Sequence, residues 1–133
     1  MSRKGERALR YEDLLDEAAR MGVRVEERPM APGKCGYYYD PGHLIIIDEN
    51  MPDYMRRCTL VHELVHAEHH DQGGHGDAKA ERRARRETAL RCIRPVDYAT
   101  AERIYGGDSF LIAQALDLTV QIIDDYKAIL HGE

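Results

Sequence analysis

At 133 residues, the chain is long enough to bury a core and has the size of one domain. Its formal net charge of −5 argues against a general affinity for nucleic acid, and its longest strongly apolar run, residues 44–47, is too short to cross a bilayer. Residues 1–11 are charged and lack the apolar segment of a secretory signal, and the three widely spaced cysteines form no C-x-x-C pair. We therefore expect a cytoplasmic protein with reduced thiols and no membrane contact.

The N-terminal third of the chain predicts one helix followed by three short strands. Residues 1–10 are basic and expected to be flexible, and residues 11–21 carry apolar side chains at helical spacing before a glycine. Strands are expected at residues 23–26, 36–39 and 43–48, with Asp40-Pro41-Gly42 as the turn between the last two. Because the last strand is continuously apolar, we expect both of its faces to be covered.

The remainder of the chain is predicted to be helical. A helix with Pro52 in its first turn, capped by Asn50 or Asp53, runs to about His70. Four further helices follow the glycine-rich loop 71–77, at residues 78–93, 96–105, 109–116 and 119–130. The fold class is therefore α+β, a single domain (1–133) in which a small, mostly antiparallel three-stranded sheet packs on the helix before His70 and on a helical bundle.

The helix that ends near His70 contains the pattern His62-Glu63-x-x-His66. Histidines four residues apart lie on one face of a helix, where both imidazoles can bind one metal ion, usually zinc. Glu63 is turned away from such an ion and can act as the base for a water molecule whose pKa zinc lowers. The alternative is a pair of core histidines that bond to carboxylates, because apolar neighbours would bury this helix.

A catalytic zinc site needs a third protein ligand. The acidic residues and histidines that follow the motif are the candidates: Glu68, His69, His70, His75, Glu81 and Glu87. A third ligand from the same helix would form a nearly linear row that suits tetrahedral zinc badly. The longer zincin pattern would require a histidine at position 72, where the chain has Gln72. These arguments leave the following helix, with Glu81 and Glu87.

The chain resembles the ImmA/IrrE-type metallopeptidases at three places. These are the segment 59–66, the run Glu81-Arg82-Arg83-Ala84 that begins fifteen residues after His66, and the later Ile93 and Pro95. These proteins are common in phage-related and mobile-element regulatory operons. The resemblance covers about residues 11–130 and implies a zincin-like fold. It also implies a Zn²⁺ ion held by His62, His66 and Glu81, with Glu63 as the general base. The implied function is zinc-dependent cleavage of a protein or peptide substrate, with a regulator such as a transcriptional repressor as the substrate class.

The chain departs from this family at four positions. Arg85 stands where Asn or Asp is usual, Glu87 where an aromatic residue is usual, Thr88 where alanine is usual, and Val65 where glycine is common. Loss of the Asn or Asp removes a side chain that could orient a zinc histidine. The alternative function is therefore a catalytically weak or inactive zinc-holding interaction or sensor domain that binds a regulatory partner.

Two further features bear on partners. Arginines 82, 83, 85, 86, 91 and 94 form a basic face, which we expect to be solvated and partly paired with acidic side chains; docking of an acidic partner segment is the alternative. Residues 112–120 resemble a helix-turn-helix, but Asp124 and Asp125 would repel phosphates, so we expect a helical pair that closes the core and no contact with nucleic acid.

Substrate is expected to add as an extended strand along the edge of strand 43–48.

Overall fold

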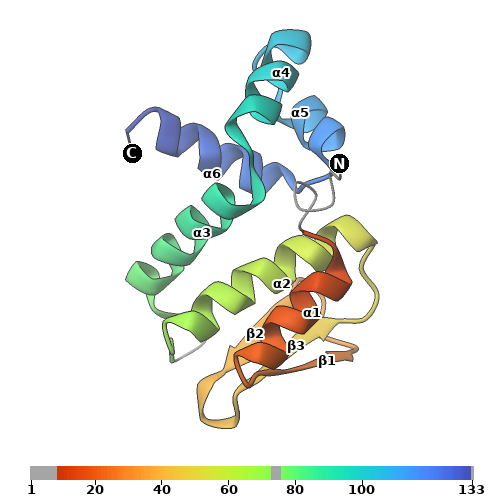
Figure 1. Ribbon diagram of the computed structural model, residues 1–133, viewed down its shortest axis with the longest axis vertical. Helices are drawn as coiled ribbons and strands as arrows, with labels where there is room; N and C mark the ends of the chain where they lie inside the picture. Colours follow the sequence, from red (N-terminus) through yellow and green to blue (C-terminus); the bar gives the residue numbers. More distant parts are fainter. Residues whose placement is uncertain (1–8, 73–75, 133) are drawn as a thin grey trace.

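The computed structural model describes residues 9–72 and 76–132 (Figure 1). Within these described residues the elements are, in chain order, α1 (Tyr11–Arg20), β1 (Arg24–Arg28), β2 (Gly36–Tyr39), the short 3₁₀ helix η2 (Asp40–Gly42), β3 (Leu44–Asp48), α2 (Asp53–Glu68), α3 (Ala78–Cys92), α4 (Pro95–Tyr105), α5 (Ser109–Leu116) and α6 (Val120–Leu130). The chain is α+β, as predicted, and each predicted element is present with its bounds within two residues. Residues 1–8 of the expected flexible segment, and His75, lie outside the described residues.

The three strands form a mixed sheet in the order β1-β3-β2, so the prediction of a mostly antiparallel sheet is wrong. β1 pairs with β3 in parallel, with Arg24 opposite Leu44, whereas β2 pairs with β3 antiparallel, with Gly36 opposite Ile47. The loop 29–35 carries the chain across the sheet, and the β2–β3 hairpin then returns β3 beside β1. β3 is the central strand, and the prediction that it offers an open edge to substrate is therefore wrong; the edges belong to β1 and β2.

One face of the sheet packs against α1 and α2, which lie side by side over it (Figure 1). Ile45 and Ile47 point into this layer and are fully buried, whereas Leu44 and Ile46 on the other face are only partly covered. The prediction that both faces of β3 are covered is confirmed for one face and only in part for the other, because a continuously apolar sequence does not distinguish one fully covered face from two. Tyr38 joins the same core, while its neighbours Tyr37 and Tyr39 are exposed.

A second core lies among α3, α4, α5 and α6, and α2 contributes Cys58 to it. Ile112 of α5 and Ile123 of α6 are fully buried there. Asp117 adopts a left-handed conformation with φ 59° and ends α5, after which Thr119 caps α6 by accepting a hydrogen bond from the backbone N–H of Ile122. The helix-turn-helix-like segment is thus a helical pair that closes a core, as predicted.

The start of α2 differs from the prediction in one respect. Pro52 occupies the cap position itself, with φ −63° and ψ 160°, and neither predicted residue supplies a capping side chain. Asp53 is instead the first helical residue, where its carboxylate binds Arg56 and Arg57 and where a negative charge interacts favourably with the helix dipole.

Among the residues described, no helix combines the length and the apolarity needed to span a membrane.

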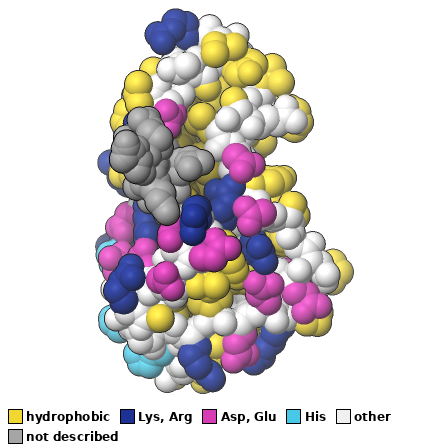
Figure 2. All heavy atoms as spheres, turned by 45° about the vertical axis from the view of Figure 1, so that its right-hand side comes forward, with side chains coloured by type: hydrophobic (Ala, Val, Ile, Leu, Met, Phe, Trp, Pro, Cys, Tyr) yellow, Lys and Arg dark blue, Asp and Glu magenta, His cyan; other side chains and the backbone are white. Residues whose placement is uncertain are grey.

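Acidic and basic side chains are interspersed over the middle and lower part of the face in Figure 2, while apolar side chains gather at its upper end. Most of the arginines at and after α3 are paired with acidic side chains, as predicted: Arg83 with Asp71, Arg85 with Asp125, Arg91 with Glu17 and Arg94 with Asp97. The three cysteines are free thiols.

Candidate metal centre

The helix α2 presents His62 and His66 on successive turns of one face. Their ring centroids are 5.0 Å apart and the rings are inclined at 74°. His66 is buried, with 2% of its surface exposed, and the side chain of His62 is 17% exposed. Burial lowers the pKa of His62 below its usual value, and the nearby carboxylates of Glu63 and Glu81 only partly oppose this shift. The partly buried imidazole of His62 is thus held in the neutral form that a metal ion requires.

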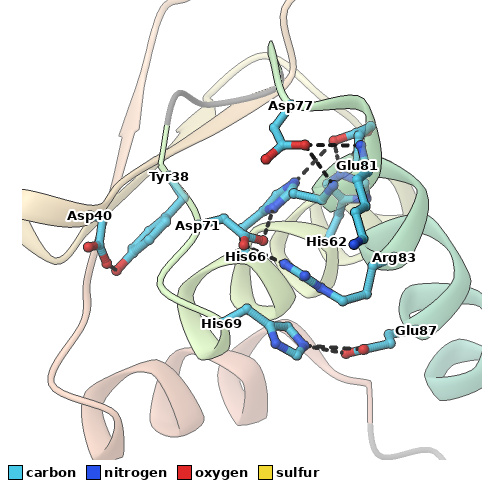
Figure 3. A network of polar contacts seen from close by, with 12 residues as sticks. Tyr38, Asp40, His62, His66, His69, Asp71, Asp77, Glu81, Arg83 and Glu87 are labelled. Atoms are coloured by element: carbon cyan, nitrogen blue, oxygen red, sulfur yellow. Dashed lines mark hydrogen bonds and ion pairs between the residues drawn. The ribbon is translucent and has the colours of Figure 1, made fainter.

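Glu81 reaches these histidines from the first turn of α3. This helix begins where Asp77 accepts hydrogen bonds from the backbone N–H groups of Lys79 and Ala80, at 3.0 and 3.1 Å. Glu81 follows Asp77 by four residues. Its Oε1 lies 3.1 Å from His66 Nε2 and 3.3 Å from His62 Nε2, and its Oε2 lies 3.1 Å from His62 Nε2 (Figure 3). The three side chains named by the resemblance therefore converge, although two separate helices carry them.

The spacing of these atoms fits the donor set of a zinc site. In a tetrahedral zinc site, ligand atoms about 2.0–2.1 Å from the ion stand about 3.3–3.4 Å from one another. The measured distances from the carboxylate of Glu81 to His62 and His66, 3.1–3.3 Å, are close to that value. Two imidazole nitrogens and one carboxylate also form a ligand set that leaves a fourth position for water or substrate. The arrangement is suited to a catalytic metal rather than to a closed structural one.

Asp71 is a residue of this site that the sequence reasoning missed. Its Oδ2 lies 2.8 Å from His66 Nδ1, the ring nitrogen that faces away from Glu81, while its Oδ1 accepts a hydrogen bond from Arg83 (Figure 3). A carboxylate at this nitrogen fixes the tautomer and the orientation of a metal-binding histidine. Although burial opposes it, the bonds from Arg83 and His66 keep the pKa of Asp71 below its usual value, so it is ionised near neutral pH.

Glu63 completes the arrangement from the same turn of α2. It is 1% exposed and lines, with His62 and Glu81, a cavity of about 910 Å³. Strand β2 and the loop before it form one wall of this cavity, and α3 and α6 form the other. β2 approaches α2 very closely here, because a Cβ on Gly36 would lie 2.7 Å from Thr59 Cγ2 and 3.3 Å from Glu63 Cγ. Glycine at this position therefore allows the edge strand to reach the motif.

The other candidate ligands are held elsewhere in the structure. Glu87 lies six residues after Glu81 and binds His69, whose Nε2 is 3.0 Å from Glu87 Oε1 (Figure 3). His70 is largely exposed, and its Nδ1 lies 3.1 Å from Asp40. Glu68 joins His69 and Glu87 in a second, exposed group that lies outside the cavity. Of the candidates within the described residues, Glu81 is the one that meets both motif histidines.

Comparison with known proteins gives one finding. The family model Peptidase_M78, described as the IrrE N-terminal-like domain, matches residues 18–102, which include α2 and all of α3. Searches of curated proteins and of solved structures returned no significant match. The matched segment covers well over half of the chain and contains each of the converging side chains described above. The chain therefore belongs to the IrrE N-terminal-like family of metallopeptidases.

Proposed function

We propose that the protein is a zinc-dependent endopeptidase that hydrolyses a peptide bond in a protein substrate. The observation that carries this proposal is the convergence of two imidazoles and one carboxylate from α2 and α3 beside a second buried carboxylate, that of Glu63. Bound zinc would supply Lewis acidity, which lowers the pKa of water and polarises a carbonyl group. His62, His66 and Glu81 would hold the ion.

Glu63 is proposed as the general base. A carboxylate next to the candidate ligands, but not among them, can accept a proton from the attacking water and later donate it to the leaving amine. Glu63 lines the cavity, although only 1% of its surface is exposed. Asp71 has a positioning role, because it holds the ring of His66 from the side opposite Glu81.

Substrate is proposed to lie extended along β2 rather than along β3. β2 is an edge strand, and Gly36 and Tyr37 on it line the cavity that contains Glu63. Backbone hydrogen bonds to such an edge can align a peptide without demanding a particular sequence. Family membership favours a regulatory protein such as a transcriptional repressor as the substrate class.

A zinc-holding partner or sensor domain without catalysis is the alternative function, and the replacement of Asn or Asp by Arg85 was its main support. Asp71 weakens that support, because it supplies a carboxylate to His66 from a different position in the chain. The substitution Glu63→Gln separates the two functions. It preserves size and hydrogen bonding but cannot accept a proton, so cleavage should fall by about 10²-fold or more.

The test has two parts. Purified zinc-loaded protein would be incubated with a random decapeptide library, and cleavage sites would be identified by mass spectrometry; in parallel, the gene would be co-expressed with neighbouring open reading frames. Zinc content and melting temperature of the Glu63→Gln variant serve as controls for an intact site. Equal processing by the wild type and by a correctly folded, zinc-loaded Glu63→Gln variant would rule out the proposed role of Glu63.

A further inference from the structure

The cavity continues beyond the candidate ligands along α3. Glu81, Arg85 and Thr88 stand at positions i, i+4 and i+7 of this helix and all line the cavity. At a rise of 1.5 Å per residue, Arg85 follows Glu81 by about 6 Å along the helix axis and Thr88 follows it by about 10 Å. A side chain of a bound substrate that points toward α3 beside the candidate metal centre would therefore meet a cation and then a threonine.

The guanidinium of Arg85 is fixed in place by α6. Its Nε and Nη2 donate hydrogen bonds to the carboxylate of Asp125, at 3.3 and 2.8 Å, and Gln121 Nε2 donates to the same carboxylate at 3.0 Å. Asp125 thus receives bonds from two side chains, and its side chain is only 13% exposed. Arg85 is 43% exposed at the cavity and has five N–H donors, so it can bind a further acceptor. Because the ion pair with Asp125 already restricts the guanidinium, it loses little further conformational entropy when it binds that acceptor.

Thr88 provides a second and independent observation. The residue is 2% exposed, and its hydroxyl group has no hydrogen-bond partner among the residues that the structure describes. A buried hydroxyl without a partner is destabilising, because it has lost its bonds to water without replacement. Thr88 lines the cavity one turn beyond Arg85, and because threonine has two χ1 rotamers available in a helix, its hydroxyl can turn toward a ligand there.

Once a divalent ion is bound, the charges around the cavity favour an anion. Two cations line it, Lys34 from the loop before β2 and Arg85 from α3, together with the three carboxylates of Glu63, Glu81 and Asp125. With a divalent ion bound, the cavity would carry a net positive charge, although the chain as a whole carries −5. A local field of this sign attracts negatively charged groups and disfavours cationic ones. This count already includes Asp125, whose carboxylate binds Arg85 and Gln121.

We propose that Arg85 and Thr88 form a specificity subsite that binds an acidic side chain, Asp or Glu, close to the scissile bond of the substrate. A carboxylate can accept charge-assisted hydrogen bonds from the guanidinium and a further bond from the hydroxyl. This inference rests on the proposed peptidase function and adds a substrate preference to it.

The preference can be measured without knowledge of the natural substrate. The probes are short peptide amides with an N-terminal hydroxamate, which binds zinc, and with Glu, Gln or Lys at the first or second residue after it. Affinities for the zinc-loaded protein would be determined by calorimetry. We expect the Glu probe to bind about tenfold more tightly than the matching Gln probe at one of the two positions, the scale of a charge-assisted hydrogen bond. The Lys probe should bind most weakly.

Variants of α3 then assign this preference to its residues. Arg85→Gln should abolish the discrimination between Glu and Gln, and Arg85→Lys should retain part of it. The matched control is Arg86→Gln, because Arg86 is exposed on the same helix and does not line the cavity. Thr88→Val should reduce the discrimination and Thr88→Ser should preserve it. Melting temperature and zinc content of each variant confirm that the fold and the metal site are intact.

Two results would overturn the inference while the proposed function stands: equal binding of the Glu and Gln probes to the wild type at both positions, or a preference that survives in Arg85→Gln. A loss of affinity in Arg85→Gln that is equal for every probe would also overturn it, because such a loss indicates a general role near the reacting groups. Acetohydroxamate, a small hydroxamate without a peptide, tests the metal site alone. If the wild type binds neither zinc nor acetohydroxamate, the proposed function is wrong and the proposed subsite is wrong with it.

Discussion

Asp71 Oδ2 lies 2.8 Å from His66 Nδ1, so the buried histidine is held between two carboxylates, with Glu81 at its other nitrogen. The same Asp71 accepts a hydrogen bond from Arg83, which joins the segment after α2 to α3. This arrangement means that the orientation of one candidate ligand depends on a residue outside the motif. It also leads to the first prediction.

Replacement of Asp71 by alanine should weaken zinc binding by about 10–100-fold, because His66 loses the group that fixes its tautomer and ring orientation. Competition with a chelator of known affinity provides the measurement. Arg83→Gln is the control, since it removes the ion pair with Asp71 but leaves the contact to His66. An equal loss of zinc affinity in both variants would assign the effect to the ion pair instead.

The protein should bind about one zinc ion per chain, and His62→Ala or His66→Ala should abolish stoichiometric binding, because two ligands hold zinc far less well than three. Metal content after gel filtration would be measured by mass spectrometry. His131→Ala is a suitable control, because His131 lies beyond the end of α6 and does not line the cavity. Stoichiometric zinc in the double His62→Ala/His66→Ala variant would show that the metal binds elsewhere.

Glu81→Gln should weaken zinc binding strongly, whereas Glu87→Gln should not. The reason is geometric: Glu81 meets the two motif histidines, while Glu87 binds His69 on another part of the helix surface. The zinc affinities of the two variants would be compared at one pH. The opposite ranking would move the third ligand to Glu87 and contradict the family register.

Gly36→Ala should destabilise the protein by about 1–3 kcal/mol, because the added methyl group meets a packed surface that cannot give way freely. Its Cβ would stand 2.7 Å from Thr59 Cγ2. Thr59→Ser removes that methyl group, so the double variant should regain part of the lost stability. Urea denaturation would supply the four free energies of unfolding.

Gly107→Ala is the control for Gly36→Ala, because a Cβ at Gly107 has no heavy atom within 4 Å among the described residues. This substitution should change stability little. If Gly36→Ala is as mild as Gly107→Ala, then β2 can move away from α2 at low cost. The close approach of the edge strand to the motif would then be incidental.

Local chemistry determined much of what the sequence predicted. Helix and strand bounds follow from short-range patterns, such as the turn at Asp40–Gly42 and the helical spacing of the apolar side chains in α1. The relation between His62 and His66 is equally local, since the α-helix by itself places them on one face. These features need no knowledge of distant parts of the chain, and for that reason the bounds agree to within two residues.

The tertiary structure decided what depends on contacts between distant segments. Whether β3 lies at the centre or at the edge of the sheet is set by pairing with β1 and β2, which is not encoded in its own apolar run. The choice between Glu81 and Glu87 depends on how α3 is rotated about its axis against α2, and one helical residue turns a side chain by about 100°. Asp71 became part of the site only because the segment after α2 folds back toward His66. Sequence periodicity fixes the faces of an element, but packing alone fixes which faces meet.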